Sequence, residues 1–303
     1  MTENDRGINI ISANIAEFRR RIRICNEQKS ISVHMLAEYI CANAKGRQPG
    51  SLYADFVKLA SERPGFTDVT AEDKVEFCRV LCNTPHFRFA SGVRYLIESS
   101  AKESVPENAI GRIAYVRNRY NDEAFLKFSS VITRSRAAYS STFEEACDNV
   151  FNGLCEFCIL PIENTVSGKL FSFYSLIDRY DLKIVCSCDI DTADKKSGSV
   201  RYALIRKNLC DLKSAGAGNL RYLEFSMAND ESVSLSDILA AGKLCSVRLY
   251  KTDTIPLPYN DLVFRFYHTF VIGPQAEEDP FIMYLSLEYP QFEPIGLYSD
   301  LQV

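Results

Sequence analysis

The residues best suited to chemistry follow a single predicted strand. An apolar run over 157–160 predicts this strand, and Glu163, Asn164, Thr165 and Ser167 come directly after it. In an open α/β sheet, ligands bind just beyond the carboxyl ends of strands, where loop amides and helix N-termini favour anionic groups. These four side chains supply hydrogen-bond donors and acceptors there, so they form a candidate site for an anionic small molecule. The alternative is that Asn164, Thr165 or Ser167 caps the following helix.

The histidines and cysteines do not predict a metal site. His34, His86 and His268 lie far apart without ligand spacing, and the Cys-x-x-Cys pair of Cys155 and Cys158 has no second pair and no His nearby. Most of the eleven cysteines stand inside apolar runs, which is typical of buried, reduced thiols. We therefore expect no metal and no cofactor.

Size and charge limit the classes of function. The 303 residues are 47% hydrophobic and 24% charged, enough for a sizeable core and two or three domains. The N-terminus lacks a basic segment followed by an apolar one, and no stretch reaches the roughly 18 apolar residues that span a bilayer. We expect a cytoplasmic protein without a membrane partner. A formal net charge of −4 argues against general nucleic-acid binding.

A basic segment near the N-terminus is the exception to this charge. It contains Arg19, Arg20, Arg21 and Arg23. These arginines flank an apolar stripe with 4-3-4-3 spacing, made of Ile11, Ile15, Phe18, Ile22 and Cys25. Such spacing predicts one helix with a buried seam and a basic outer face. The simple interpretation is a solvated helix face, and the alternative is a DNA-binding regulator that uses this helix.

Residues 1–105 carry only helical signals and predict an all-helical domain. Beyond the first stripe, apolar residues recur at helical spacing over 33–44, 53–60 and 93–98. Thr70 with Asp73 is a capping pair that opens a further helix.

Residues 106–212 alternate between strand and helix. The predicted strands are 112–116, 137–139, 157–160, 182–188 and 201–205, and the predicted helices are 122–128, 143–152 and 170–180. This alternation predicts a mostly parallel α/β sheet covered by helices.

Residues 213–303 form a third predicted domain after the short linker 215–218. The predicted strands are 220–227, 245–251, 262–272 and 295–301, and the predicted helices are 234–244 and 281–289. The order βαββαβ is the ferredoxin-like arrangement.

The α/β segment over 112–188 resembles prephenate dehydratase. Its most specific part is LPIENTVSG over 160–168, which is similar to the active-site loop of that family. A helix that ends at Gly153 and a strand precede this loop, as they do in the family. Residues 213–303 resemble the ACT domain that follows the dehydratase in that family, with 295–298 similar to its closing strand.

The N-terminal helices occupy the place of chorismate mutase in bifunctional relatives. Residues 15–22 have a slight similarity to the first helix of that domain, and Arg19 is the closest match to its substrate-binding arginine.

The resemblance implies a carbon–oxygen lyase, because the family converts prephenate to phenylpyruvate with loss of carbon dioxide and hydroxide. That reaction needs an acid near the departing hydroxyl and donors that hold two carboxylates. The resemblance implies catalytic candidates at Glu163, Asn164, Thr165 and Arg201 and ligand-binding candidates at Asn164, Thr165, Ser167, Gly168 and Arg201.

Three departures from the family pattern predict that catalysis is lost. Residues 116–121 replace a glycine-rich turn, and Val200 replaces the threonine of a Thr-Arg-Phe motif, although Arg201 remains. Only residues 189–199 stand where the family has an entire second lobe. Without that lobe there is no cleft to exclude water and orient a substrate.

The expected architecture is therefore a single α/β lobe of the prephenate dehydratase, periplasmic-binding-protein-like type, between an all-helical domain and an ACT-like domain. We expect a non-catalytic protein with a regulatory role, one that binds an aromatic amino acid or a prephenate-like carboxylate and forms a homodimer through the ACT-like domain. The alternative is an active prephenate dehydratase, or a bifunctional chorismate mutase and prephenate dehydratase, of phenylalanine biosynthesis. A second alternative is the DNA-binding regulator.

Overall fold

The computed structural model of the chain divides into two compact units, residues 1–90 and residues 91–303. The structure describes residues 3–44, 46–62, 68–85, 91–100, 106–164, 168–169, 171–192, 198–211, 220–228, 234–257 and 260–301. The domain boundaries expected after residues 105 and 212 stay predictions.

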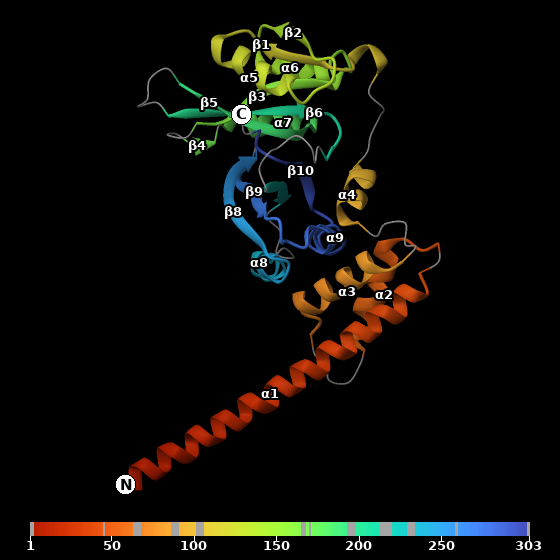
Figure 1. Cartoon of the computed structure of the whole chain (residues 1–303), viewed down its shortest axis with the longest axis vertical. Coiled ribbons are helices and arrows are strands. Elements are labelled where there is room, and N and C mark those ends of the chain that lie inside the picture. Colours follow the sequence, from red (N-terminus) through yellow and green to blue (C-terminus); the bar gives the residue numbers. More distant parts are fainter. Residues whose placement is uncertain are drawn as a thin grey trace. The chain divides into compact units, whose positions relative to one another are not determined.

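The first unit contains the helices α1 (Glu3–Ala42), α2 (Pro49–Ser61) and α3 (Ala71–Asn83), which Figure 1 shows in red and orange. Pro49 opens α2 at a position where no backbone donor is lost. The predicted capping pair of α3 is confirmed, since Thr70 and Asp73 form a reciprocal capping box. Asp73 also accepts a 2.6 Å hydrogen bond from Lys29 Nζ, which ties α3 to α1.

The predicted buried seam of α1 is wrong. Among the α1 side chains that the structure describes, the buried ones lie in the C-terminal part of the helix, at Val33, Leu36, Ala37, Ile40 and Cys41. The side chain of Ile11 lies outside the described ones. Ile15, Phe18 and Ile22 are instead 46%, 62% and 60% exposed. The reason is length, because α2 and α3 have 13 residues each and cover only part of a 40-residue helix. The two predicted stripes form one continuous helix, since no Gly or Pro separates them.

The second unit opens with α4 (Gly92–Ser100) and a short 3-10 helix (Glu107–Ala109). The helix α4 packs against the later helix α9 (Glu278–Glu288). Asp279 of α9 accepts hydrogen bonds from Ser91 Oγ at 2.7 Å and from the backbone amide of Val93 at 3.0 Å. This carboxylate satisfies one of the free amide donors at the start of α4, and Ser91 Oγ accepts from the amide of Arg94.

The α/β part that follows has a mixed sheet. Its strands are β1 (Arg112–Val116), β2 (Arg136–Ser140), β3 (Phe157–Asn164), β4 (Gly168–Lys169), β5 (Lys183–Asp191) and β6 (Ser199–Arg206), and its helices are α5 (Arg119–Ser129), α6 (Phe143–Phe151) and α7 (Phe171–Tyr180). The strand β1 is parallel to β2 and β3, whereas β6 is antiparallel to both β3 and β5. The prediction of a mostly parallel sheet is wrong at β6, because the connection over 192–198 is too short for a parallel crossover.

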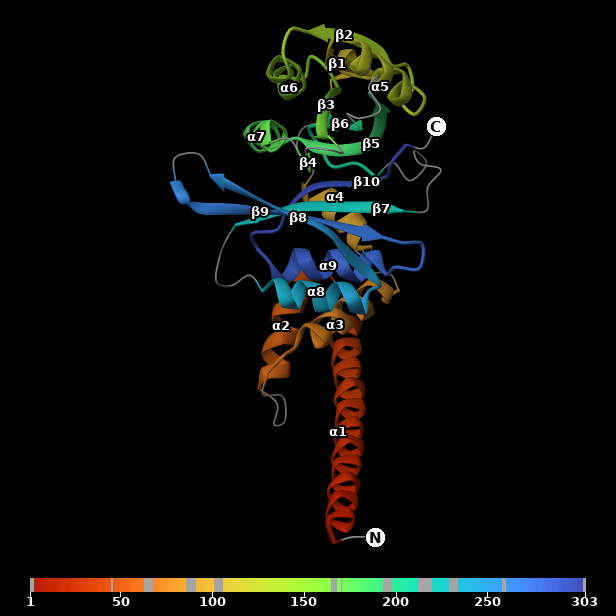
Figure 2. The same cartoon turned by 90° about the vertical axis from the view of Figure 1, so that its left-hand side faces the viewer.

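The C-terminal part has the predicted βαββαβ order. It consists of β7 (Arg221–Ala228), α8 (Leu235–Leu244), β8 (Val247–Leu257), β9 (Asn260–Ile272), α9 and β10 (Glu293–Tyr298). These strands are antiparallel in the order β10-β7-β9-β8. Figure 2 shows α8 and α9 on one side of this sheet and α7 on the other. Phe225 and Phe270 stack in the core, and the ring of Phe281 on α9 packs on Phe270.

The two parts of the second unit share one sheet of ten strands. They join where β10 runs parallel to β5, with Gly296 opposite Ile184. Leu301 N donates a 2.7 Å hydrogen bond to Ser187 O just beyond β10. A Cβ atom at Gly296 would lie 2.7 Å from the Ile184 Cβ, so this contact requires glycine.

The predicted class is therefore confirmed as an N-terminal helical region with a mixed α/β sheet. The predicted burial of the thiols is also confirmed for most cysteines, and all of them are free. Among the described helices, none has the length and apolar character to cross a membrane.

Candidate functional site

The strand β3 carries the first candidate residues. The sequence predicts its end at Leu160, but β3 continues to Asn164 because Pro161 lies at a β-bulge, where the missing amide is tolerated. Glu163 and Asn164 are therefore strand residues, and they pair with Lys169 and Gly168 of β4. Thr165 and Ser167 lie outside the described residues.

Glu163 is bonded to the C-terminal part of the chain. Its Oε1 accepts a hydrogen bond of 3.3 Å from Lys251 Nζ on β8. The same ammonium lies 3.4 Å from Asp253 Oδ1. All three side chains are about three-quarters buried. Glu163 lies in the segment that resembles an active-site loop, and its charge is balanced by Lys251 of the same chain.

Arg201 is held by two carboxylates. Its Nε and Nη2 bond Asp189 Oδ1 and Oδ2 at 2.9 and 3.1 Å, and Nη2 lies 3.4 Å from Asp300 Oδ2. Burial acts to lower the pKa of Arg201, but the hydrogen bonds to Asp189 and the charges of Asp300 and Asp189 outweigh burial and raise that pKa. The guanidinium is permanently charged, and its bidentate face is occupied.

The sheet brings Glu163 and Arg201 side by side, as register partners on β3 and β6. Asn164 lies opposite Val200 in the same pair of strands. The strand pairing therefore brings these candidates close together. The side chains of Glu163 and Arg201 nevertheless bond to other residues, Lys251 and Asp189. Asp300, which Ser187 Oγ also contacts through a hydrogen bond, follows β10 at the join of the sheet.

A buried tyrosine and carboxylate network lies beside Glu163 and Lys251. Glu224 on β7 is 0% exposed. Its Oε1 and Oε2 accept hydrogen bonds from the hydroxyls of Tyr174, on α7, and Tyr298, on β10, at 2.9 and 2.8 Å. Tyr174 also lies 3.3 Å from Asp253 Oδ2, which connects the network to Lys251.

Protonated tyrosines suit this network. Burial raises the pKa of Tyr174, and the charges of Glu224 and Asp253 raise it further. Burial and then Glu224 likewise raise the pKa of Tyr298 well above its ordinary value. Both hydroxyls therefore stay protonated and donate to Glu224, a buried acceptor that is costly to leave without hydrogen bonds.

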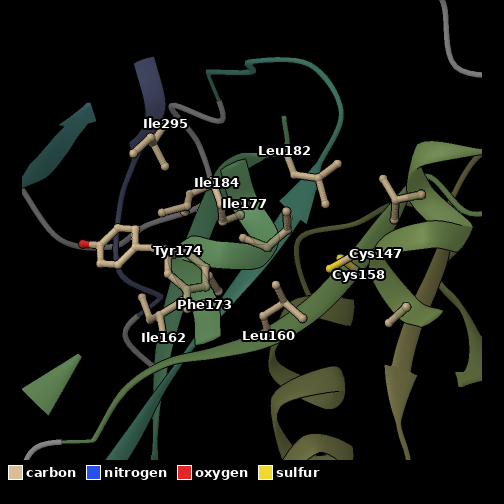
Figure 3. Close-up of a cluster of buried hydrophobic side chains, with 14 of the residues drawn as sticks. Cys147, Cys158, Leu160, Ile162, Phe173, Tyr174, Ile177, Leu182, Ile184 and Ile295 are labelled. Atoms are coloured by element: carbon tan, nitrogen blue, oxygen red, sulfur yellow. The ribbon is translucent and has the colours of Figure 1, made fainter. Parts of the chain in front are cut away.

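The network is anchored in the main apolar core of the second unit. Figure 3 shows Tyr174 beside Ile162 and Phe173, with Ile295 of β10 near the same end of the cluster. The ring of Tyr174 also packs on the ring of Tyr267 from β9, whose hydroxyl donates to Asp178. Side chains from both parts of the second unit thus fill the space next to β3.

Sequence reasoning missed Lys251, Asp253, Glu224, Tyr174 and Tyr298. Glu224 gave one signal, since it is a charged residue in the middle of an apolar predicted strand, and such residues are rarely buried unless paired. The other four look like ordinary surface or core residues, and only the join between β5 and β10 brings them together.

The two cations of the site already have carboxylate partners. A substrate carboxylate that binds Arg201 would compete with Asp189 and Asp300, and one that binds Lys251 would compete with Glu163. Within the described part of the chain, no cluster of three or more His, Cys, Asp or Glu residues could hold a metal ion.

Comparison with known proteins identifies a similar fold but little sequence similarity. No protein-family model and no curated protein matches the sequence. Among solved structures, a prephenate dehydratase from Streptococcus mutans matches with a TM-score of 0.51 at 13% identity, over 63% of this chain and 99% of that chain.

Two further structures match less well. One is described as GqqA, a novel type of quorum quenching acylase, with a TM-score of 0.46 at 20% identity over 62% of this chain and 94% of that chain. The other is a prephenate dehydratase from Arthrobacter aurescens in complex with L-Phe, with a TM-score of 0.46 at 11% identity over 62% of this chain and 89% of that chain. The similarity to the Streptococcus structure shows that this chain has a prephenate dehydratase-like fold.

Proposed function

We propose that this chain is a non-catalytic protein of prephenate dehydratase-like fold with a regulatory role. The observation that carries the proposal is the bond between Lys251 on β8 and Glu163 on β3. It means that the ferredoxin-like part is bonded to the strand on which the family resemblance would place the substrate.

Two further observations support the loss of catalysis. Arg201, the one residue retained from the Thr-Arg-Phe motif, is bonded to Asp189 and faces Asp300. The strands β5 and β6 are direct antiparallel neighbours joined by residues 192–198, where the resemblance implies a second lobe. Neither arrangement leaves the cation and the enclosed cleft that a decarboxylative elimination uses.

The test is turnover of prephenate at neutral pH, followed by the absorbance of phenylpyruvate. The proposal expects a rate equal to the spontaneous background at every protein concentration. A rate that rises in proportion to protein would support the working dehydratase, the alternative that the sequence leaves open.

We further propose that the regulatory role is the binding of an aromatic amino acid or a prephenate-like carboxylate by the ACT-like domain. The βαββαβ order supports this assignment, together with the resemblance of 213–303 to the ACT domain. Homodimers through this domain belong to the same proposal. A ligand that binds only the folded state raises the melting temperature. Phenylalanine or tyrosine should therefore raise it, and a flat response across an amino-acid panel would contradict this role.

The DNA-binding alternative depends on Arg19, Arg20, Arg21 and Arg23. It expects salt-sensitive retardation of DNA that is lost when the four are replaced together. If the chain does not retard DNA at low salt, the DNA-binding alternative is wrong.

A further inference from the structure

The strand β2 is an open edge of the sheet. Among the described strands it pairs with β1 alone, and Figure 2 shows it as the outermost strand of the α/β part, at the top of the view. The amide of Arg136 donates to Gly111 O on the β1 side. Because a parallel ladder alternates, the backbone N–H and C=O groups of Ala137 and Tyr139 point away from β1. Both residues are exposed, so they offer backbone groups to a further strand.

Arginines flank both ends of this strand. Arg134 and Arg136 lie at its N-terminal end, and Arg117 and Arg119 follow the end of β1, which pairs with the C-terminal end of β2. All four are exposed, and within the described part of the chain none of their guanidinium groups bonds to a carboxylate. Residues 112–140 contain six Lys or Arg and two Asp or Glu, whereas the whole chain has a formal net charge of −4. We call β2 together with these four arginines the β2 edge.

The β2 edge has a fixed aromatic surface beside its free backbone groups. The ring of Tyr139 is 59% exposed, and it packs edge-on against Tyr115 with 5.4 Å between the ring centroids. The guanidinium of Arg117 lies 5.2 Å from the centroid of the same ring. A side chain that is already held in place loses little conformational entropy when a ligand packs on it. Tyr139 is therefore suited to contact an incoming chain.

The local fold does not account for the arginine at position 134. The backbone of Arg134 is in the left-handed region, with a φ of 58°, which glycine or asparagine adopts more readily. Its side chain is exposed and makes no ion pair among the described residues. The charge of Arg134 is thus available to a partner.

We propose that the β2 edge binds an extended acidic peptide segment of another protein, which adds to the sheet as a further strand. Backbone groups of Ala137 and Tyr139 supply the hydrogen bonds, and the arginines at the two ends select carboxylates. The five residues of β2 span about 16 Å, so the segment carries acidic residues at both ends of a short β-branched centre. That centre packs on Tyr139. The proposal goes beyond the proposed function and does not depend on whether prephenate is turned over.

The charges argue against a second copy of this chain as the partner. Parallel pairing of two β2 strands would bring Arg134 and Arg136 of one copy beside the same residues of the other. Antiparallel pairing would bring them beside Arg117 and Arg119 of the other copy. Like charges across a strand pair are destabilising, so both orientations are disfavoured.

A labelled peptide tests the role of the arginines. The probe is a fluorescein-labelled heptapeptide of the sequence DEVTVED, and fluorescence anisotropy measures its binding to the full chain. Arg117→Glu combined with Arg136→Glu should raise the dissociation constant at least about 10-fold, because attraction becomes repulsion at both ends of the strand. High salt should also weaken binding.

The control makes the same change of charge at the other edge of the sheet. Lys243 on α8 and Arg248 on the edge strand β8 are both exposed. Lys243→Glu combined with Arg248→Glu should leave the dissociation constant of DEVTVED within about twofold of the native value. Equal effects of the two double variants, or no binding of DEVTVED by the native chain, would overturn the proposal.

A second peptide separates strand addition from attraction of charge alone. DEVPPED has the same charges as DEVTVED, but one of its two adjacent prolines must replace an amide that would face β2. It should bind at least about 10-fold more weakly, because that hydrogen bond is lost and the ring fits a strand poorly. Equal binding of the two peptides would overturn strand addition. Tighter binding of a labelled oligothymidine that displaces DEVTVED would also overturn the proposal, because the surface would then serve a nucleic acid.

A change in the protein backbone makes the same test from the other side. Ala137→Pro removes an amide that points away from β1, so the pairing of β1 and β2 is kept. This variant should bind DEVTVED as weakly as the native chain binds DEVPPED, with an unchanged circular dichroism spectrum. Native affinity in a folded Ala137→Pro chain would overturn the role of the β2 backbone.

Discussion

At the scale of single residues, Glu224 is a fully buried carboxylate that accepts hydrogen bonds from two other elements of the second unit. A fully buried carboxylate is costly unless several donors satisfy it. Tyr174 and Tyr298 supply donors from α7 and β10, elements that lie far apart in the sequence. The network therefore makes the docking of the ferredoxin-like part on the α/β part specific as well as stable.

Removal of one donor should be measurable. We predict that Tyr174→Phe lowers the free energy of unfolding by about 1 to 3 kcal/mol, because the buried carboxylate loses a hydrogen bond while the ring remains. Urea unfolding followed by circular dichroism measures this change. Tyr180→Phe, on the same helix, should stay within about 0.5 kcal/mol of the native chain. Equal stability of Tyr174→Phe and the native chain would contradict a stabilising network.

His268 should make the second unit sensitive to acid. Burial lowers the pKa of His268 to about 4, below the ordinary value of 6.5. Between these values the unfolded chain binds a proton that the folded chain does not. The stabilising contribution is therefore complete above pH 6.5 and is lost as the pH falls toward 4.

We predict that the native chain loses about 2 to 3 kcal/mol more than His268→Gln does between pH 7 and pH 4.5. Unfolding curves at the two pH values give this difference. His34→Gln is the control, because the pKa of His34 is raised, chiefly by its hydrogen bond to Glu76. Its contribution is present below pH 6.5 and is lost as the pH rises, so this variant should not protect against acid. An acid loss in His268→Gln as large as that of the native chain would refute the assignment.

At the scale of elements, the sequence predicts most helices and strands, because their apolar periodicities are regular. Besides the antiparallel β6, two wrong predictions have physical causes. A proline suggests the end of a strand, but Pro161 lies at a bulge and β3 continues. An apolar stripe suggests burial, but whether another helix covers the stripe depends on the lengths of α2 and α3.

The join between β5 and β10 gives a prediction for these strands. Gly296→Ala should destabilise the second unit by about 1 to 3 kcal/mol, because its Cβ would overlap Ile184. The same change at Gly50, where the added methyl meets no atom within 4 Å, should be neutral or slightly stabilising for the first unit. Thermal unfolding of both variants checks the pair. An unchanged melting curve for Gly296→Ala would contradict the need for glycine at this contact.

At the scale of the whole molecule, the candidate site could be predicted only in part. Glu163, Asn164 and Arg201 are recognisable from the sequence, and they lie in register on β3 and β6. Their partners are not, because Lys251 and Asp300 reach them only through the ten-stranded sheet that unites the second unit. Local patterns identify a residue type, whereas long-range pairing of strands decides whether that residue is available to a substrate.

The most direct test of the central claim is prephenate turnover by the native chain beside Arg201→Lys, a change that keeps the charge but loses the bidentate geometry. We predict that both proteins leave the formation of phenylpyruvate at the spontaneous rate at neutral pH. Turnover by the native chain that is proportional to its concentration and is lost in Arg201→Lys would contradict the claim, because Arg201 would then serve a substrate instead of Asp189 and Asp300.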